Sequence, residues 1–167
     1  MKSQKTRNEL NLIEEFERFI RDCRRGRRLH PGGKKLCAGT ITNYDYTLHH
    51  LRRFSAQQEM ILRIRPVRWL NGRELIAERK YWKKFYTGFT AYLYDECGCY
   101  DNYVGQLVKN LKAFFNYLNK EKPMYAGEFH KEFYVSREEV AIYPLMPEEL
   151  RFLVTDHSFE KGLCLRL

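Results

Sequence analysis

The strongest constraint in the sequence is an apolar stripe that repeats at helical spacing between residues 101 and 122. Apolar side chains recur three or four positions apart at Val104, Leu107 or Val108, Leu111, Phe114 or Phe115, and Leu118. Side chains at this spacing share one face of an α-helix. Asp101 or Asn102 is a candidate N-cap, and Pro123 ends the segment. The pattern predicts a helix with one buried face and one polar face.

Two earlier segments show the same period. Residues 8–24 repeat apolar side chains behind Thr6 and Glu9, which stand at capping-box positions. Residues 40–59 repeat them behind Thr40, a candidate N-cap. Each segment predicts an amphipathic helix. Between them lies a basic connector with a proline and paired glycines, a composition typical of turns.

A third helix is predicted from about residue 75 to Cys97, where Cys97-Gly98-Cys99 ends it. The preceding residues, 60–75, alternate apolar and basic side chains and are interrupted by Pro66. Asn71-Gly72 is a local turn signal, but the proline argues against a regular strand. We interpret this segment as an extended connection.

The composition changes after Pro123. Residues 133–145 favour extended structure, and the MPEELRFLV stretch indicates a further helix with Pro147 in its first turn. We therefore expect a helical domain over residues 1–122. Residues 123–167 are expected to form an interdomain linker and the start of a truncated domain, as part of a longer protein.

The charge is positive and unevenly distributed. The chain has 30 Lys and Arg against 21 Asp and Glu, a formal net charge of +9. Residues 1–120 hold 24 basic and 12 acidic side chains, a net of +12, whereas residues 121–167 hold 6 and 9, a net of −3. The interval between Asp22 and Asp45 has no acid and contains Arg24, Arg25, Arg27, Arg28, Lys34 and Lys35. Such a cluster attracts polyanions, although a solvated charged loop has the same composition.

Several classes of protein are excluded or disfavoured. No stretch approaches the ~18 uncharged apolar residues of a membrane span, and the N-terminus lacks the apolar core of a secretory signal. Five cysteines without regular spacing argue for a reducing compartment rather than a disulfide framework. The motifs GxxxxGK[ST], GxGxxG, GxSxG and HExxH are absent, so catalysis by this chain is not expected.

Two smaller patterns have ordinary structural explanations. Cys97-Gly98-Cys99 lacks the second ligand pair of a zinc site, so we interpret these residues as thiols at a helix end. His49 and Arg52 form an H-x-x-R spacing, which we interpret as the polar flank of a helix beside Leu48 and Leu51. No metal or cofactor is expected.

Polar faces on two of the predicted helices suit nucleic acid. The 40–59 helix offers Thr42, Asn43, Tyr46 and Arg53, and the 101–122 helix offers Asn102, Gln106, Lys109 and Lys112. Amides can read adenine edges, and Lys or Arg can hold guanine or phosphate. A solvated helix surface has a similar composition, so both interpretations stay open at this point.

The order of these segments resembles the N-terminal core-binding domain of tyrosine recombinases, the phage-integrase family, in the style of Bacteroides-type mobile elements. The resemblance covers roughly residues 8 to 155. It rests on the helix start TITNY with Leu48, Leu51 and Phe54 behind it, on Phe114-Phe115 before Tyr117-Leu118, and on PLMPEEL.

The resemblance implies an all-α, compact SAM-like bundle of about four helices with an extended C-terminal linker, which covers one face of duplex DNA. In relatives the second and fourth helices approach the major groove. Carried over, the first contact region is Thr40, Thr42, Asn43 and Tyr46, and the second is Asn102, Gln106 and Lys109. Phosphate contacts are expected from Lys34, Lys35, Arg53, Lys109 and Lys112.

The resemblance also implies what this chain lacks. The family's tyrosine nucleophile and its Arg, Lys and His set belong to a C-terminal catalytic domain, and Arg166 does not stand in the expected Thr-Gly-Leu-Arg context. We expect a chain that binds DNA without cutting it, in a parent recombinase that forms homo-oligomers on DNA and is associated with the bacterial nucleoid in the cytoplasm.

Two other functions stay open. One is a helical protein-interaction module whose partner surface includes tyrosines among Tyr81, Tyr92, Tyr94 and Tyr100, although core packing of these tyrosines is the favoured interpretation. The other is a stand-alone DNA-binding regulator.

Overall fold

A computed structural model of the chain describes residues 9–30, 32–125, 127–139 and 146–155. The chain divides into two units, Met1–Arg137 and Glu138–Leu167. Helices dominate the described residues, whose only sheet has two short strands. The all-α fold class predicted from the sequence is therefore confirmed.

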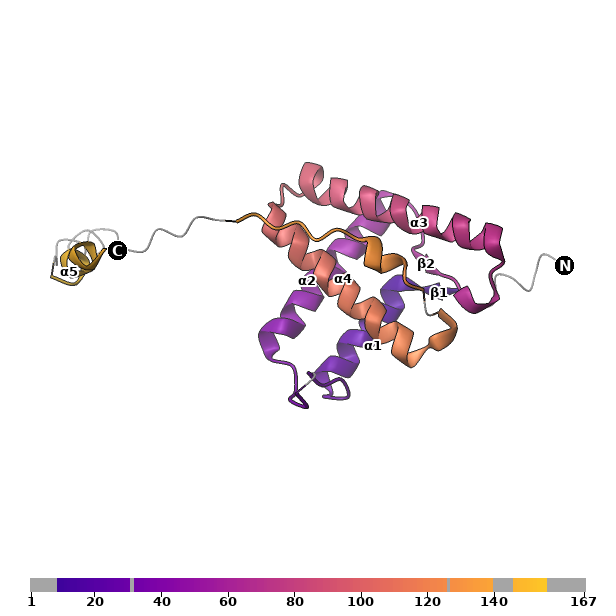
Figure 1. The fold of residues 1–167 in the computed structure, drawn as a ribbon, viewed down its shortest axis with the longest axis horizontal. Helices are drawn as coiled ribbons and strands as arrows, with labels where there is room; N and C mark the ends of the chain where they lie inside the picture. The colour runs from indigo at the N-terminus through magenta and orange to yellow at the C-terminus, as the bar shows by residue number, and fades with distance from the viewer. Residues whose placement is uncertain (1–8, 31, 126, 140–145, 156–167) are drawn as a thin grey trace. The chain divides into compact units, whose positions relative to one another are not determined.

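Four α-helices form the first unit and a fifth lies in the second: α1 (Leu12–Arg24), α2 (Ala38–Gln57), α3 (Gly72–Ala91), α4 (Asp101–Glu121) and α5 (Pro147–Thr155). Figure 1 shows α3 along one side of the first unit, with α1, α2 and α4 crossing one another beside it. Helix α2 contacts both α1 and α4. In the second unit, α5 begins at Pro147, as predicted.

Helix α1 begins later than expected because a strand precedes it. Strand β1 (Leu10–Asn11) pairs antiparallel with β2 (Arg63–Ile64). The Asn11 side chain then caps α1 by accepting a hydrogen bond from the Ile13 amide at 2.9 Å. Thr6, the cap expected from the sequence, lies outside the described residues.

The expected extended connection contains β2 and the short 3₁₀ helix η2 (Val67–Trp69). The interpretation of Asn71-Gly72 as a turn signal is wrong. Asn71 is the N-cap of α3 and forms a capping box with Glu74, so this helix begins at Gly72 rather than near residue 75. After Ala91 the helix continues as the π-helical turn η3 (Tyr92–Glu96).

The core of the first unit is built by the apolar stripes of its helices. Phe16 and Phe19 of α1 pack on Phe114 of α4, with ring centroids 4.9 and 5.7 Å apart. Leu51 of α2 and Leu111 of α4 are also buried. Full burial of one such side chain stabilises a fold by about 1.5–3 kcal/mol. These buried residues belong to the apolar stripes predicted from the sequence.

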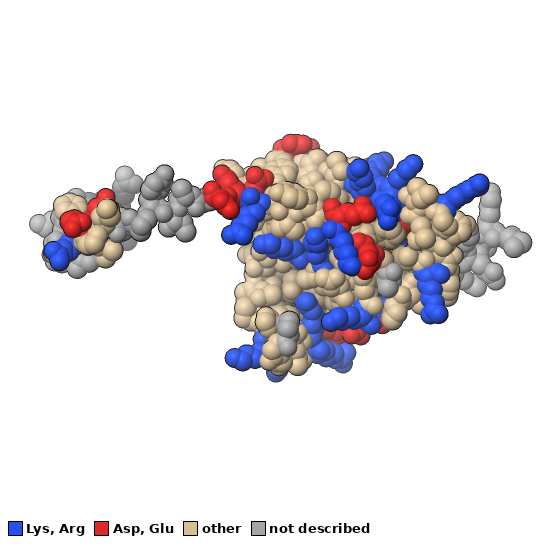
Figure 2. All heavy atoms as spheres, in the orientation of Figure 1, with Lys and Arg blue, Asp and Glu red and all other residues tan. Residues whose placement is uncertain are grey.

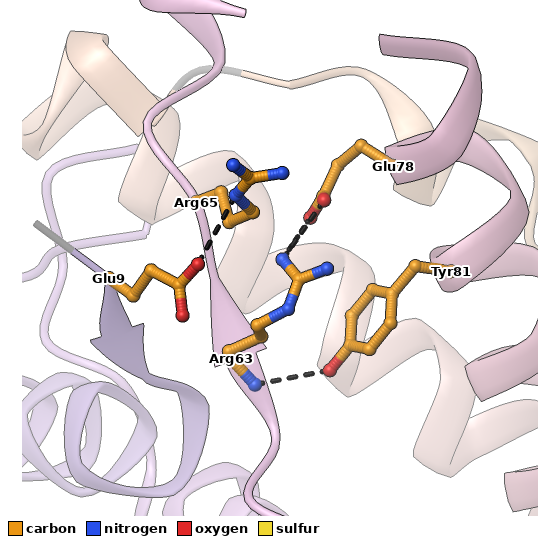
Figure 3. A network of polar contacts seen from close by, with 5 residues as sticks. All are labelled: Glu9, Arg63, Arg65, Glu78 and Tyr81. Atoms are coloured by element: carbon orange, nitrogen blue, oxygen red, sulfur yellow. Dashed lines mark hydrogen bonds and ion pairs between the residues drawn. The ribbon is translucent and has the colours of Figure 1, made fainter. Parts of the chain in front are cut away.

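A polar network joins the β1–β2 region to α3 (Figure 3). Glu78 of α3 is 1% exposed, and the Arg63 guanidinium donates to both of its carboxylate oxygens, at 3.0 and 3.3 Å. The Arg63 amide donates to the Tyr81 hydroxyl at 3.1 Å, and its guanidinium lies over the Tyr81 ring. Arg65 pairs with Glu9 at 3.2 Å. Arg63 and Arg65 therefore stabilise the fold through these contacts.

Residues 127–137, which we call the strap, pack across α3 and α4. Within the strap, η5 (Phe129–Glu132) precedes Phe133, which is 3% exposed and lies beside Phe85 and Phe115. Tyr86 of α3 donates its hydroxyl to the Tyr134 carbonyl at 3.0 Å.

Two polar side chains of the strap and α4 add to this packing. His130 is buried, stacks on Phe115 and contacts the Asn116 side-chain oxygen at 2.9 Å. Lys112 donates to the Phe133 carbonyl at 2.9 Å. The compact unit therefore continues through Arg137, beyond the boundary expected at residue 122. The described part of the expected extended segment, residues 133–139, has no regular secondary structure.

The close approach of the strap to α4 depends on Gly105. A Cβ atom at Gly105 would lie 1.9 Å from the Ser136 carbonyl oxygen, so the backbone would have to move. We expect Gly105→Ala to destabilise the protein by about 1–3 kcal/mol, the usual cost of overpacking. Denaturant unfolding followed by circular dichroism measures the change.

The matched control is Gly88→Ala in α3, where the new Cβ meets only the Phe54 ring at 3.5 Å. Alanine favours helix over glycine, so this variant should be up to about 1 kcal/mol more stable than the wild type. Equal stability of the two variants would show that the strap does not approach α4 at Gly105.

Candidate nucleic-acid interface

Helix α2 presents a row of polar side chains to solvent. At spacings of four, three and four residues, one helix face carries the exposed side chains of Thr42, Tyr46, His49 and Arg53. Tyr46 is 53% exposed, which is high for an aromatic residue. The opposite face of α2 is buried through Leu48 and Leu51, so this row is the surface that the fold leaves available.

Helix α4 presents a second row. Asn102, Gln106 and Lys109 share a face at spacings of four and three residues. Asn102 and Lys109 are exposed and Gln106 is half-buried. The buried stripe that opposes this row runs from Val104 to Leu118.

A buried amide joins the two rows where α2 and α4 meet. The Asn110 side-chain nitrogen donates to the Asn43 carbonyl at 3.1 Å and to the Thr47 hydroxyl at 2.9 Å, while its oxygen accepts from the Gln106 amide at 3.1 Å. Thr47 also donates to the Asn43 carbonyl. Asn43 and Gln106, predicted separately from the sequence, are therefore linked through one residue.

We call the resulting surface the α2–α4 face: Thr42, Asn43, Tyr46, Arg53, Asn102, Gln106 and Lys109. Asn110 was not predicted from the sequence, where its signal is a polar residue inside an otherwise apolar helical stripe. A buried Asn that satisfies its donors and acceptor fixes the register of the helices that it joins.

His50 and Tyr103 form a second contact between α2 and α4. The His50 Nε2 atom lies 3.3 Å from the Tyr103 hydroxyl, and the two rings meet edge to face. Burial lowers the pKa of His50 below its usual range, and the neighbouring His49 and Arg53 lower it further. The surroundings of His50 therefore favour its neutral form. Tyr103, like Asn110, was not predicted from the sequence.

The predicted cap of α2 is wrong. The helix begins at Ala38 with Cys37 as its N-cap residue, and Thr40 lies in its first turn. The half-buried Thr40 has its hydroxyl 3.1 Å from the Cys37 sulfur, while the Thr42 hydroxyl donates to the Ala38 carbonyl at 3.1 Å. The Thr40 hydroxyl and amide lower the pKa of the Cys37 thiol. Thr42 is exposed, but Thr40 offers less surface to a ligand.

The remaining predicted cations lie in different places. Lys34 and Lys35 are exposed in the connector between α1 and α2. Lys112 is half-buried and holds the strap through the Phe133 carbonyl, so the structure does not bring it to the α2–α4 face. Figure 2 shows Lys and Arg side chains over the end of the first unit where the α1–α2 connector lies.

Three of the four tyrosines considered for a partner surface are not freely exposed. Tyr92 is buried at 5% exposure, and Tyr81 and Tyr94 are half-buried against the core. Tyr100, at 82% exposure, is the one exposed tyrosine of this set.

Among the described residues, no three or more His, Cys, Asp or Glu side chains are grouped so as to hold a metal ion. Within the same part of the chain, no helix has both the length and the apolar character that crossing a membrane requires.

No protein-family model, curated protein or solved structure matches this chain.

The lowered pKa values of His50 and His130 predict that stability falls in mild acid. Burial is the main cause of both shifts. Below about pH 6.5 the unfolded chain therefore binds more protons than the folded one, so the free energy of unfolding should fall from pH 8 toward about pH 5.5. Urea unfolding of the wild type across this range measures the slope.

The slope should be smaller in His50→Gln, which removes one of the two histidines whose pKa is lowered. His30→Gln is the control, because His30 is exposed in the connector between α1 and α2. A His50→Gln slope identical to that of the wild type would contradict a neutral, half-buried His50.

Proposed function

We propose that the first unit binds duplex DNA through the α2–α4 face. The observation that carries this proposal is the Asn110 contact, which links the Asn43 carbonyl with the Gln106 amide across the two helices. Amides, hydroxyls and an exposed aromatic on one surface supply groups for base edges and sugars. Arg53 and Lys109 add positive charge for the phosphates.

Binding by such a surface is mainly electrostatic. Four of the exposed cations on the face and in the connector belong to the predicted contact set: Lys34, Lys35, Arg53 and Lys109. If each neutralises one phosphate, these four together contribute about −3.6 to the slope of the logarithm of the affinity against the logarithm of salt concentration. This face by itself should bind with a Kd of about 10⁻⁴ to 10⁻⁶ M, the range of non-specific contacts.

The resemblance of the sequence to core-binding domains extends the proposal. On this reading the chain is the DNA-clamping part of a tyrosine recombinase, acts in integration or recombination of DNA, and leaves strand cleavage to a catalytic domain. The all-α bundle and the pairing of the second and fourth helices support the reading. The residues proposed to contact DNA are those of the α2–α4 face with Lys34 and Lys35.

One observation favours a second candidate, a protein-interaction module. A groove of about 600 Å³ between the end of α2 and α3 has an apolar floor that includes Phe54, Met60 and Phe85, with Lys83 and Lys84 on its lining. Half-buried Tyr81 also lines it. Aromatic and basic side chains are common at protein interfaces.

A pair of charge reversals separates the two functions. Lys109→Glu changes the α2–α4 face, and Lys83→Glu makes the same charge change at an exposed helical position in the groove. We expect Lys109→Glu to weaken binding of a 20-base-pair duplex about tenfold or more, since a contact becomes a repulsion. Lys83→Glu should bind as the wild type does. Fluorescence anisotropy measures both affinities.

Circular dichroism should show that both variants stay folded. If neither the wild type nor the variants bind duplex DNA, the proposal is wrong. If Lys109→Glu leaves any measured DNA affinity unchanged while Lys83→Glu abolishes self-association, the interaction module is the better account.

A further inference from the structure

A second cationic site lies between the α1–α2 connector and the C-terminal half of α4. A groove of about 480 Å³ there is lined by Arg27, Arg28, Asn116, Tyr117, Lys120 and Glu121, among others. Three of these side chains are positively charged and one carries a carboxylate. Arg27 and Arg28 belong to the basic cluster found in the sequence, but none of the six residues was among the predicted DNA contacts.

Arg28 is fixed in this groove by aromatic side chains. Its guanidinium carbon lies 4.7 Å from the centroid of the Phe19 ring and 5.8 Å from that of Tyr44, and its Nη1 atom donates to the Tyr44 hydroxyl at 3.0 Å. Within the described part of the chain, no carboxylate lies within ion-pair distance of Arg28. An arginine held rigidly on aromatic faces keeps its planar set of donors ready for an oxyanion.

The other charges of the groove leave it positive. Arg27 lies 3.5 Å from Asp22, a long ion pair, and the Asp22 carboxylate also accepts from the Tyr117 hydroxyl at 2.7 Å. Burial and the neighbouring Asp22 raise the pKa of Tyr117, so this hydroxyl stays protonated as a donor. Lys120 is exposed and Glu121 is the carboxylate of the lining.

The groove continues the polar row of α4. Asn116 and Lys120 follow Lys109 by seven and eleven residues, so they lie on the same side of the helix. At 1.5 Å per residue, Lys120 stands about 16 Å along the axis from Lys109. The major groove of B-DNA is about 12 Å wide between its two backbones. One duplex on the α2–α4 face can therefore bring a second stretch of backbone to this groove.

We propose that this groove binds phosphate groups, held by Arg28, Arg27 and Lys120, and anchors the duplex backbone beside the α2–α4 face. The identity of the ligand as DNA rests on the proposed function. The binding of an oxyanion in this groove does not depend on that function, because a free phosphate ion offers the same acceptors to these donors.

The test compares two double variants that remove equal charge. Arg27→Gln/Lys120→Gln neutralises the groove without touching Arg28, whose packing supports the fold. Lys80→Gln/Lys84→Gln is the control on α3. Binding of a 20-base-pair duplex is measured from about 50 to about 200 mM NaCl, a range over which counterion release changes the affinity strongly. The salt slope should become less negative by about 1.8 in the groove variant, for two lost phosphate contacts, and stay unchanged in the control.

A groove variant with the wild-type slope would overturn this inference and leave the proposed function intact. If the wild type binds no duplex, the proposed function fails. A titration with inorganic phosphate then tests whether the groove binds phosphate groups. In that case the Asn116 side-chain amide signals in ¹H–¹⁵N spectra should shift with added sodium phosphate in the wild type and not in the groove variant. No shift with phosphate would overturn the site as well.

Discussion

The side-chain amide of Asn110 is the contact on which the proposed surface depends. It satisfies the Asn43 carbonyl and the Thr47 hydroxyl of α2 and accepts from Gln106 of α4. Asn110 is buried, so sliding α2 along α4 would leave its side-chain nitrogen without acceptors, at a cost of about 1–3 kcal/mol. This cost fixes how the exposed rows of the two helices lie relative to each other.

The fold itself uses much of the positive charge. Arg24 pairs with Asp45 at 2.6 Å, Arg52 with Glu17 at 2.7 Å, and Lys122 with Glu15 at 2.8 Å. Arg63 and Lys112 are committed to the Glu78 carboxylate and the strap. The net charge of +9 is therefore a poor guide to where a polyanion would bind. Several exposed cations of the described residues have no ion pair, including Lys80, Lys83 and Lys84 of α3; Arg53, Lys109 and Lys120 are the ones that lie on the surfaces of α2 and α4 proposed to bind DNA.

The helices could be predicted from the sequence because their signals are local. Apolar residues repeat along the 101–122 segment at helical spacing, and the buried residues of α4 from Val104 to Leu118 follow that pattern. The row from Thr42 to Arg53 could be predicted for the same reason. A helix whose inward face is known has its outward face determined too.

The remaining features depend on contacts between residues far apart in the chain. Asn110 meets Asn43 across 67 positions, and the π-helical turn, the strap and the start of α1 at β1 each need a partner elsewhere. In the sequence Lys112 cannot be told from an exposed lysine. Its structural role comes from the hydrogen bond that it donates to the Phe133 carbonyl. Sequence patterns report only on residues that are close together in the chain. They therefore predict which face of a helix is exposed, but not which residues of two helices contact each other.

The central claim is that α2 and α4 present one surface to one ligand. A ¹H–¹⁵N correlation titration of the chain with a 20-base-pair duplex tests it most directly. The account predicts that backbone amides around Thr42–Tyr46 and Asn102–Lys109 shift together and saturate at one common Kd. Shifts confined to a single helix, or to the Lys80–Lys84 stretch of α3, would contradict it.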